Sequence, residues 1–325
     1  MKAFLLAAGR GVRFRPVTER IPKPLLPYLN VPLARAHLQR LKNAGVTEAG
    51  VNLHHLGHEI EQHLSEGAME LPKLVFFHEP EILGTAGALK NAASLLFDGD
   101  FLVVNSDAAI EPDFARLLAA HRESGHPATL LVVENRQPRR YTPLQAEGNR
   151  IAAFGLDTPR PLLYTGVCVL SPRLLTRIPP GPRQLVADLW QPMLAEGREQ
   201  IGFVRHEGPF SDLGRPSDFL GASLETLERG GPFPKDAGDF DTEKRVLCVE
   251  ALRGFEAHRS VLGRAVYGAG ARLSRCAVFS GAAIGPRARL TGCLVAGGRV
   301  AAGAAYESVL LWPDVDGAAA PLPLS

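Results

Sequence analysis

The chain has 325 residues, which corresponds to about two domains at roughly 150 residues each and leaves room for a substantial core. Hydrophobic residues make up 46% and charged residues 22%, so a generally disordered chain is excluded. The net charge of +2 provides no basic field for nucleic acid or an acidic membrane surface, so any anionic ligand must be held by a local site.

The N-terminal stretch MKAFLLAA is shorter than a signal peptide, and no run approaches the ~18 apolar residues of a membrane span. We therefore expect a cytoplasmic protein without membrane contact. The cysteines form no C-x-x-C pair, which predicts buried free thiols and neither a zinc site nor a disulfide framework. They are Cys168, Cys248, Cys276 and Cys293.

Up to about residue 227, short apolar runs alternate with amphipathic segments, which predicts a doubly wound, mostly parallel α/β sheet covered by helices. Strands are expected at residues 3–7, 50–53, 74–77, 101–104, 129–133 and 166–170. Helices are expected at residues 34–43, 58–64, 86–96 and 112–123, where apolar residues recur at three- and four-residue spacing.

The composition changes after this region. Residues 229–239 read RGGPFPKDAGD, which is typical of a linker. Beyond residue 260 the chain is rich in Gly and Ala with isolated aliphatic residues, and Val278, Ile284 and Leu290 lie six residues apart. One apolar residue on each flat side of a triangular coil is typical of a parallel β-helix.

We therefore expect a short left-handed parallel β-helix at the C-terminal end of the chain. The alternative is an irregular tail, because Val295 and Val300 follow at five-residue steps. The predicted organisation is a first domain at residues 1–228, a connecting segment at 229–259, and the repeat with its tail at 260–325.

The most informative stretch, residues 5–27, reads LLAAGRGVRFRPVTERIPKPLLP. A predicted strand runs directly into a turn with glycines at positions 9 and 11. Because glycine has no Cβ, the backbone amides of such a turn can approach a phosphate chain closely. The spacing fits neither the P-loop nor the dinucleotide-binding fingerprint.

Two further motifs follow predicted strands. Residues 83–89 read LGTAGAL and open a helix with small residues, which leaves room for a flat ring and is expected to expose unpaired backbone groups; Glu79 lies just upstream. Residues 103–107 read VVNSD, which places Asp107 at the carboxyl end of a buried strand, where open α/β sheets bind ligands. A Mg²⁺ that bridges phosphates needs one or two such carboxylates, so Asp107 is a candidate metal ligand.

The motif Gly9-x-Gly11-x-Arg13, with Lys23-Pro24 and the LGTAG segment, resembles the signature of sugar-1-phosphate nucleotidyltransferases. The resemblance extends to residues 210–216, FSDLGRP, which are similar to the family pattern W-x-D-[IV]-G-T-P, and to residues 164–167, YTGV. It implies a Rossmann-like nucleotidyltransferase domain that transfers a nucleoside monophosphate from an NTP to a sugar 1-phosphate and releases pyrophosphate.

The resemblance also implies roles for individual residues. It gives Arg13 and Lys23 the catalytic contacts to phosphate, Thr165 and Gly166 the contacts to sugar, and Asp107 and Asp212 the role of Mg²⁺ ligands. The nucleotide would be bound by Leu5, Ala7, Gly9, Gly11, Glu79, Gly84 and Thr85.

Several positions depart from the family pattern. Val12 replaces a Thr or Ser, Phe210 replaces the usual Trp, and Arg215 replaces the usual Thr. A Glu-Lys-Pro segment seen in many members is absent, and LDTPRP stands at residues 156–161, so the cation for the sugar phosphate is unassigned; Arg160 is one candidate.

Among family members, the LGTAG element with a short C-terminal coil looks most like mannose-1-phosphate guanylyltransferases, which implies GTP as the donor. The alternatives are a uridylyl- or thymidylyltransferase, a catalytically silent regulatory relative that binds nucleotide sugars, and an acyltransferase built on the β-helix. We expect a homo-oligomer that assembles through the C-terminal segment. Because that segment carries none of the phosphate motifs, it is expected to be dispensable for chemistry.

Overall fold

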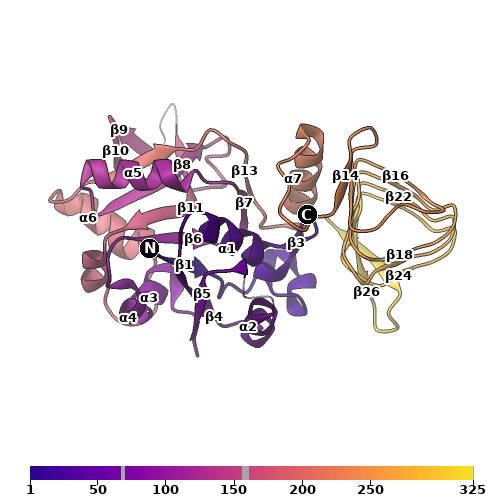
Figure 1. Ribbon diagram of the computed structural model, residues 1–325, viewed down its shortest axis with the longest axis horizontal. Coiled ribbons are helices and arrows are strands. Elements are labelled where there is room, and N and C mark those ends of the chain that lie inside the picture. The colour runs from indigo at the N-terminus through magenta and orange to yellow at the C-terminus, as the bar shows by residue number, and fades with distance from the viewer. Residues whose placement is uncertain (67–69, 156–160, 325) are drawn as a thin grey trace. The chain divides into compact units, whose positions relative to one another are not determined.

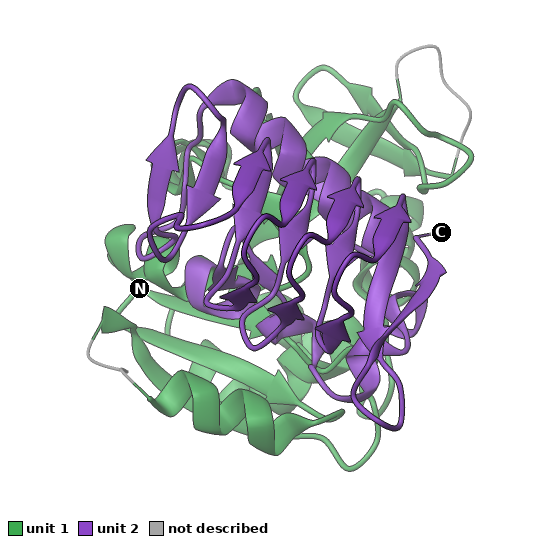
Figure 2. Ribbon diagram, turned by 90° about the vertical axis from the view of Figure 1, so that its right-hand side faces the viewer, with its two compact units in different colours: residues 1–10, 37–210 green, residues 11–36, 211–325 purple. Residues whose placement is uncertain are grey.

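The computed structural model describes residues 1–66, 70–155 and 161–324. The chain forms two compact units, coloured separately in Figure 2. Unit 1 contains residues 1–10 and 37–210, and unit 2 contains residues 11–36 and 211–325. The motif-rich stretch at residues 5–27 is therefore divided between the two units.

Unit 1 is built on a mixed sheet with the strand order β5-β4-β1-β6-β11-β8-β12-β10-β9 (Figure 1). Strands β5, β4, β1 and β6 are mutually parallel, and so are β8 and β12, whereas β11 runs antiparallel to both β6 and β8. The bounds are β1 Lys2–Leu6, β4 Glu48–Leu53, β5 Lys73–His78, β6 Phe101–Asn105, β8 Ala128–Glu134, β9 Leu144–Glu147, β10 Arg150–Phe154, β11 Leu162–Leu170 and β12 Ile201–Arg205.

The α/β class is confirmed, and the mostly parallel sheet is corrected to a mixed one. The departure begins after β8, where the chain makes the antiparallel hairpin β9–β10 and returns along β11. A hairpin reverses the chain without a crossover helix, so the strand that follows it need not be parallel to β8.

Helices in the first part of the chain are α1 Leu33–Asn43, α2 Gly57–Ser65, α3 Gly84–Asn91, α4 Ala93–Leu96, α5 Phe114–Ser124 and α6 Gln191–Glu196. Shorter helical turns are η1 Val12–Phe14, η2 Val17–Glu19, η3 Lys23–Leu25, η5 Pro172–Arg177 and η6 Leu185–Trp190, and a further short strand is β7 Ala108–Ile110. Helices α3 and α4 pack with the sheet in one core that includes Phe4, Leu89, Phe101 and Trp190.

Each strand and helix predicted for this region is present, with its ends shifted by at most a few residues. The predicted helix at residues 86–96 is divided into α3 and α4 at Ala92. Cys168, Cys276 and Cys293 are buried free thiols as predicted, while Cys248 is a free thiol that is only partly buried.

Unit 2 begins with the hairpin β2 Pro27–Tyr28 and β3 Val31–Pro32, and continues after β13 Phe210–Asp212 with helix α7 Pro216–Arg229. Leu29 and Asn30 at the hairpin turn both have positive φ, 51° and 67°. The α7 side chain of Phe219 packs edge-on against Phe14 and Tyr28 at ring-centroid distances of 5.8 and 5.7 Å. These aromatic contacts hold residues 11–36 against α7.

The rest of unit 2 consists of short strands in three stacks, with the orders β14-β15-β17-β20-β23-β26-β27, β16-β19-β22-β25 and β18-β21-β24. Within each stack neighbouring strands are parallel, except for the antiparallel outer pairs β14/β15 and β26/β27. Figure 2 shows these strands side by side along the coil. The bounds are β14 Asp239–Asp241, β15 Val246–Cys248, β16 Glu256–His258, β17 Ser260–Leu262, β18 Val266–Tyr267, β19 Arg272–Ser274, β20 Ala277–Val278, β21 Ala283–Ile284, β22 Arg289–Thr291, β23 Leu294–Val295, β24 Arg299–Val300, β25 Ala305–Glu307, β26 Val309–Pro313 and β27 Ala319–Pro323.

The residues predicted to mark the coil lie on its three different sides. Val278, Ile284 and Leu290 belong to β20, β21 and β22, one in each stack, and all three are buried. Val295 and Val300 continue the pattern in β23 and β24. Many parallel strands, with one buried aliphatic residue on each side, are consistent with a β-helix and not with an irregular tail.

The predicted connecting segment at residues 229–259 contains β14, β15 and β16. The two compact units have different boundaries from the predicted domains. Residues 11–36, which were predicted to belong to the first domain, are grouped with the C-terminal coil. The domain boundaries at residues 228 and 259 stay predictions.

Candidate active site

The glycine-rich turn between β1 and η1 depends on Gly11. This residue has φ 60°, and a Cβ placed on it would lie 2.8 Å from Thr18 Cγ2 and 3.2 Å from Lys23 Cβ. The Thr18 hydroxyl donates a hydrogen bond of 2.8 Å to the Gly11 carbonyl. A side chain at position 11 would thus both strain the backbone and displace the segment that carries Lys23.

Arg13 and Asp212 meet within unit 2. Arg13 Nη1 lies 3.5 Å from Asp212 Oδ2, and the two side chains are 47% and 16% exposed. Gly214 provides the space for the guanidinium, because a Cβ at this position would lie 2.6 Å from Arg13 Cζ. Lys23 is largely buried. The site residues Gly11, Arg13, Lys23 and Asp212 therefore all belong to unit 2.

In unit 1, a chain of hydrogen bonds links the end of β1 to the segment before α3. The Ala7 amide donates to Asn52 Oδ1 at 2.7 Å, and Asn52 Nδ2 donates to Glu79 Oε1 at 2.8 Å. The other carboxylate oxygen of Glu79 accepts from the Leu83 amide at 2.9 Å. Glu79 thus accepts from the Asn52 side chain with one carboxylate oxygen and from the Leu83 backbone amide with the other.

Asn52 is a positioning residue that the sequence analysis missed. It is a buried polar residue within the apolar strand β4, flanked by Val51 and Leu53. An amide side chain in such a run needs a hydrogen-bond partner, because a buried unpaired polar group is costly. This single polar interruption was the available signal.

The start of α3 is closed by a neighbouring segment. The carbonyl of Arg183 accepts from the amides of Ala86 and Gly87 at 2.9 and 3.2 Å, and the Thr85 hydroxyl accepts from the Leu185 amide at 2.8 Å. The expectation of unpaired amides at this helix start is therefore wrong for Ala86 and Gly87. Gly84 has φ 70°, and a Cβ on it would lie 2.5 Å from the Arg183 carbonyl oxygen.

Asp107 lies near the carboxyl end of β6, as predicted: the strand ends at Asn105, and Ser106 and Asp107 follow it. Its neighbour Ser106 is held by a 2.7 Å hydrogen bond from its hydroxyl to the Leu6 carbonyl. On the other side, the buried His37 contacts the Ala108 carbonyl through Nε2 at 2.9 Å. Burial, and secondarily the charge of Arg40, lowers the pKa of His37 to about 4, so this imidazole is neutral at pH 7.

The segment predicted to contact sugar forms an irregularity in β11. Its register against β8 shifts between Tyr164 and Cys168. Gly166 has φ 85°, and a Cβ there would lie 2.7 Å from Asn105 Cγ. The Thr165 hydroxyl is buried and donates to the Leu131 carbonyl at 2.8 Å, so it serves first to fix this backbone.

The remaining predicted residues also fall into unit 1. Leu5 lies in β1 and is fully buried, Ala7 follows that strand, and nothing lies within 4 Å of a Cβ built on Gly9. Unit 1 thus contains Leu5, Ala7, Gly9, Glu79, Gly84, Thr85, Asp107, Thr165 and Gly166. Arg160, proposed from the sequence as a compensating cation, lies outside the described residues.

Asp107 and Asp212, the predicted Mg²⁺ ligands, are carboxylates, and Mg²⁺ prefers oxygen ligands of this kind. Asp212 is the last residue of β13, in unit 2, and Asp107 lies near the end of β6, in unit 1. Across residues 1–66, 70–155 and 161–324, no group of three or more His, Cys, Asp and Glu could hold a metal ion. One or two carboxylates, with phosphate oxygens and water as further ligands, is the donor set typical of Mg²⁺ bound together with a nucleotide.

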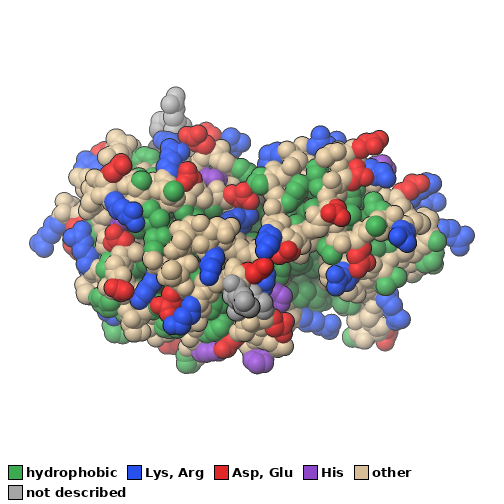
Figure 3. All heavy atoms as spheres, viewed as in Figure 1, with side chains coloured by type: hydrophobic (Ala, Val, Ile, Leu, Met, Phe, Trp, Pro, Cys, Tyr) green, Lys and Arg blue, Asp and Glu red, His purple; other side chains and the backbone are tan. Residues whose placement is uncertain are grey.

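Acidic and basic side chains are interspersed over the face shown in Figure 3. No helix among the described residues is long and apolar enough to cross a membrane. The net charge of +2 likewise provides no extended basic field for an anionic ligand.

Comparison with known proteins identifies the family of the chain. Residues 2–229 match the family model described as Nucleotidyl transferase. A mannose-1-phosphate guanyltransferase beta-B from Xenopus laevis is 31% identical over 68% of this chain and 63% of the relative. A probable mannose-1-phosphate guanylyltransferase 1 from Oryza sativa subsp. japonica is 30% identical over 91% of this chain and 86% of the relative.

Among solved structures, a putative glucose-1-phosphate thymidylyltransferase from Bacillus anthracis shares the fold. It has a TM-score of 0.63 and 19% identity, and the match covers 72% of this chain and 98% of that one. The chain belongs to the nucleotidyl transferase family. It is an enzyme that transfers a nucleotidyl group to a sugar 1-phosphate.

Proposed function

We propose that the chain transfers the guanylyl group of GTP to mannose 1-phosphate, giving GDP-mannose and pyrophosphate. The proposal rests on one observation above all: Arg13, paired with Asp212, and the buried Lys23 lie around the turn that Gly11 forms. The choice of GTP and mannose is supported by relatives of about 30% identity that carry this name.

In this reaction an oxygen of the sugar 1-phosphate attacks the α-phosphorus of the NTP, and the bond from that phosphorus to the pyrophosphate oxygen breaks. The attacking oxygen is already anionic near pH 7, so no general base is required. Catalysis then consists of in-line positioning and neutralisation of charge. Arg13 stabilises the leaving pyrophosphate, and Lys23 contacts the phosphate chain.

The other predicted residues bind and orient the substrates. Gly9 and Gly11 allow the backbone to approach the phosphates, and Leu5, Ala7, Glu79, Gly84 and Thr85 shape the nucleotide site. Thr165 and Gly166 form the sugar side. Asp107 and Asp212 would hold Mg²⁺, which supplies positive charge to the phosphate oxygens when it is bound.

A matrix of four NTPs against several sugar 1-phosphates, read by pyrophosphate release, tests the substrates. We expect the highest kcat/KM for GTP with mannose 1-phosphate. A preference for UTP or dTTP would replace this proposal with a uridylyl- or thymidylyltransferase.

The metal proposal is tested by excess EDTA and by Asp107→Ala, which should both abolish measurable turnover, because uncompensated phosphate charge costs several kcal/mol. The matched control is Asp98→Ala, which removes an exposed carboxylate that lies 3.6 Å from Lys2 Nζ. Full turnover of Asp107→Ala in EDTA would overturn the metal assignment.

We further propose that the C-terminal coil is a left-handed hexapeptide-type β-helix through which the chain forms a homo-oligomer, and that the enzyme is cytoplasmic. Light scattering of the purified chain should give a mass above 34.9 kDa, the mass of one chain. A monomeric mass would contradict the assembly.

A further inference from the structure

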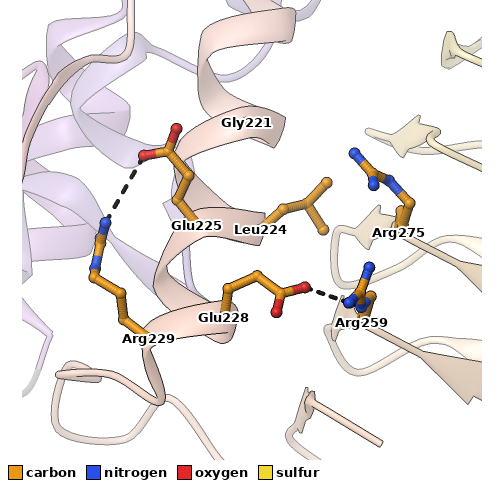
Figure 4. Close-up of a pocket in the computed structure, with 7 residues that line it drawn as sticks. All are labelled: Gly221, Leu224, Glu225, Glu228, Arg229, Arg259 and Arg275. Atoms are coloured by element: carbon orange, nitrogen blue, oxygen red, sulfur yellow. Dashed lines mark ion pairs between the residues drawn. The ribbon is translucent and has the colours of Figure 1, made fainter.

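A pocket of about 420 Å³ lies in unit 2 between α7 and the coil (Figure 4). This volume is within the usual range for small-molecule sites. Its lining residues are Gly221, Leu224, Glu225, Glu228, Arg229, Arg259 and Arg275. The residues that the proposed reaction uses are not among them, so the pocket requires an explanation of its own.

Arginines occupy one corner of the coil on three successive turns. The registers of β15, β17 and β20 align Arg245, Arg259 and Arg275, and their φ angles of 53°, 47° and 56° are all left-handed. The equivalent position on the next turn is Gly292, with φ 61°. The backbone of this corner therefore favours glycine, and its geometry does not explain three arginines.

This alignment brings positive charges close together. Adjacent strands of such a stack are about 4.8 Å apart, so the backbones of neighbouring arginines lie about that far apart. Figure 4 shows the side chains of Arg259 and Arg275 extending from the coil toward α7, with Leu224 reaching toward them from the helix.

The carboxylates of α7 do not balance these charges. Glu228 is shared, with Oε1 2.9 Å from Arg259 Nε and Oε2 3.4 Å from Arg245 Nε. Glu225 pairs with Arg229 at 3.8 Å. Arg275 forms no ion pair with any residue in the described part of the chain, and its side chain is exposed. One guanidinium at the pocket thus lacks a counter-ion.

We propose that this pocket binds a phosphorylated small molecule. Arg275 and Arg259 hold the phosphate group, and Leu224 contacts the organic part. A guanidinium presents two parallel N–H donors that match phosphate oxygens, and a multiply charged anion relieves the repulsion between stacked arginines. The site is distinct from the reaction site proposed above and does not depend on that function.

Calorimetric titration of the full chain with inorganic phosphate, glycerol 3-phosphate and GMP tests the proposal. The comparison is between wild type, Arg275→Gln and the matched control Arg287→Gln. Arg287 is also an exposed coil arginine with a left-handed backbone, φ 59°, but it does not line the pocket.

We expect Arg275→Gln to weaken binding of the organic phosphates by about tenfold or more, because it removes a charge-assisted contact, while Arg287→Gln changes it less than about twofold. Equal effects of the two variants would show a diffuse charge effect and overturn the proposal. The proposal would also be overturned if the wild-type chain bound none of the probes. It would be overturned as well if Arg13→Lys abolished binding and Arg275→Gln did not.

A second variant is expected to increase the affinity for phosphate. Glu228→Gln removes the carboxylate that competes for Arg259, so phosphate affinity should rise by about threefold or more and should fall at higher salt. Weaker binding in this variant would contradict the assignment. Binding of inorganic phosphate as tight as that of glycerol 3-phosphate and GMP would overturn the contact assigned to Leu224.

Discussion

The ion pair between Arg13 and Asp212 is weak enough for Arg13 to exchange it for another anion. Its ion pair with Asp212 is 3.5 Å long and half exposed on the arginine side, and such pairs contribute little to stability. The guanidinium can therefore exchange this carboxylate for phosphate oxygens at small cost.

We predict that Arg13→Lys lowers kcat by about 10² to 10³ and changes the affinity for NTP little, because lysine keeps the charge but loses the planar two-point contact. Steady-state kinetics and a direct NTP binding isotherm measure the two effects. Arg15→Lys is the control, since Arg15 is exposed and paired with Glu19 at 3.7 Å. If kcat were preserved and only affinity fell, Arg13 would act in the ground state alone.

His37 gives a pH-dependent contribution to stability. Its pKa is lowered to about 4 in the fold, and Nδ1 is buried without a hydrogen-bond partner among the described residues. Between pH 6.5 and pH 4, His37 is protonated in the unfolded chain but stays neutral in the folded chain. The free energy of unfolding therefore decreases as pH falls from 6.5 toward 4.

We predict that wild type loses about 2 kcal/mol of unfolding free energy through His37 between pH 7.5 and pH 5. His37→Gln keeps a donor for the Ala108 carbonyl but does not titrate, so its loss over the same range should be smaller by that amount. Urea denaturation at both pH values measures this. Burial also lowers the pKa of His121, which contributes equally to both proteins. Identical pH dependence in the two proteins would refute the assignment.

At the scale of elements, apolar runs and periodicity predicted strands β1, β4, β5, β6, β8 and β11 and helices α1 to α5, but not the strand β12 or the helix α7. They missed the hairpin β9–β10, which is short and carries polar residues such as Gln145 and Arg150. They also missed the segment around Arg183, because the contacts of that backbone with α3 join residues about 100 positions apart. Local sequence contains no record of such a contact.

Replacing either of two helix glycines by alanine is expected to change the free energy of unfolding in opposite directions. A Cβ on Gly87 in α3 would meet the Gly181 carbonyl oxygen, whereas nothing lies within 4 Å of one on Gly221 in α7. Gly87→Ala should therefore lower the unfolding free energy by about 1–3 kcal/mol, and Gly221→Ala should raise it by up to about 1 kcal/mol. Urea midpoints compare the two. Equal destabilisation by the two substitutions would show that α3 can shift to accommodate a Cβ at position 87 at no extra cost.

At the scale of the whole molecule, residues 11–36 pack with the C-terminal part of the chain. Asn30 Nδ2 donates to the carbonyls of Ala237 and Leu262 at 3.0 and 3.2 Å. On α7, Phe219 packs against Phe279 of the coil at 5.5 Å, and Arg20 lies over the Trp312 ring at 5.7 Å. Motif positions alone predict that the coil is dispensable for chemistry, and they contain no information about this long-range packing.

We predict that a chain ending at Leu227 loses turnover by about 10² or more, because the segment with Arg13 and Lys23 loses its packing partners and small displacements of catalytic groups are costly. Asn30→Ala is the milder test: removing its two hydrogen bonds should cost on the order of 1–3 kcal/mol and lower kcat as well. Asn43→Ala, at the exposed end of α1, is the control. Pyrophosphate release and urea denaturation measure both effects. Wild-type turnover by the shortened chain would show that the coil serves only in assembly, as the motif positions alone suggest.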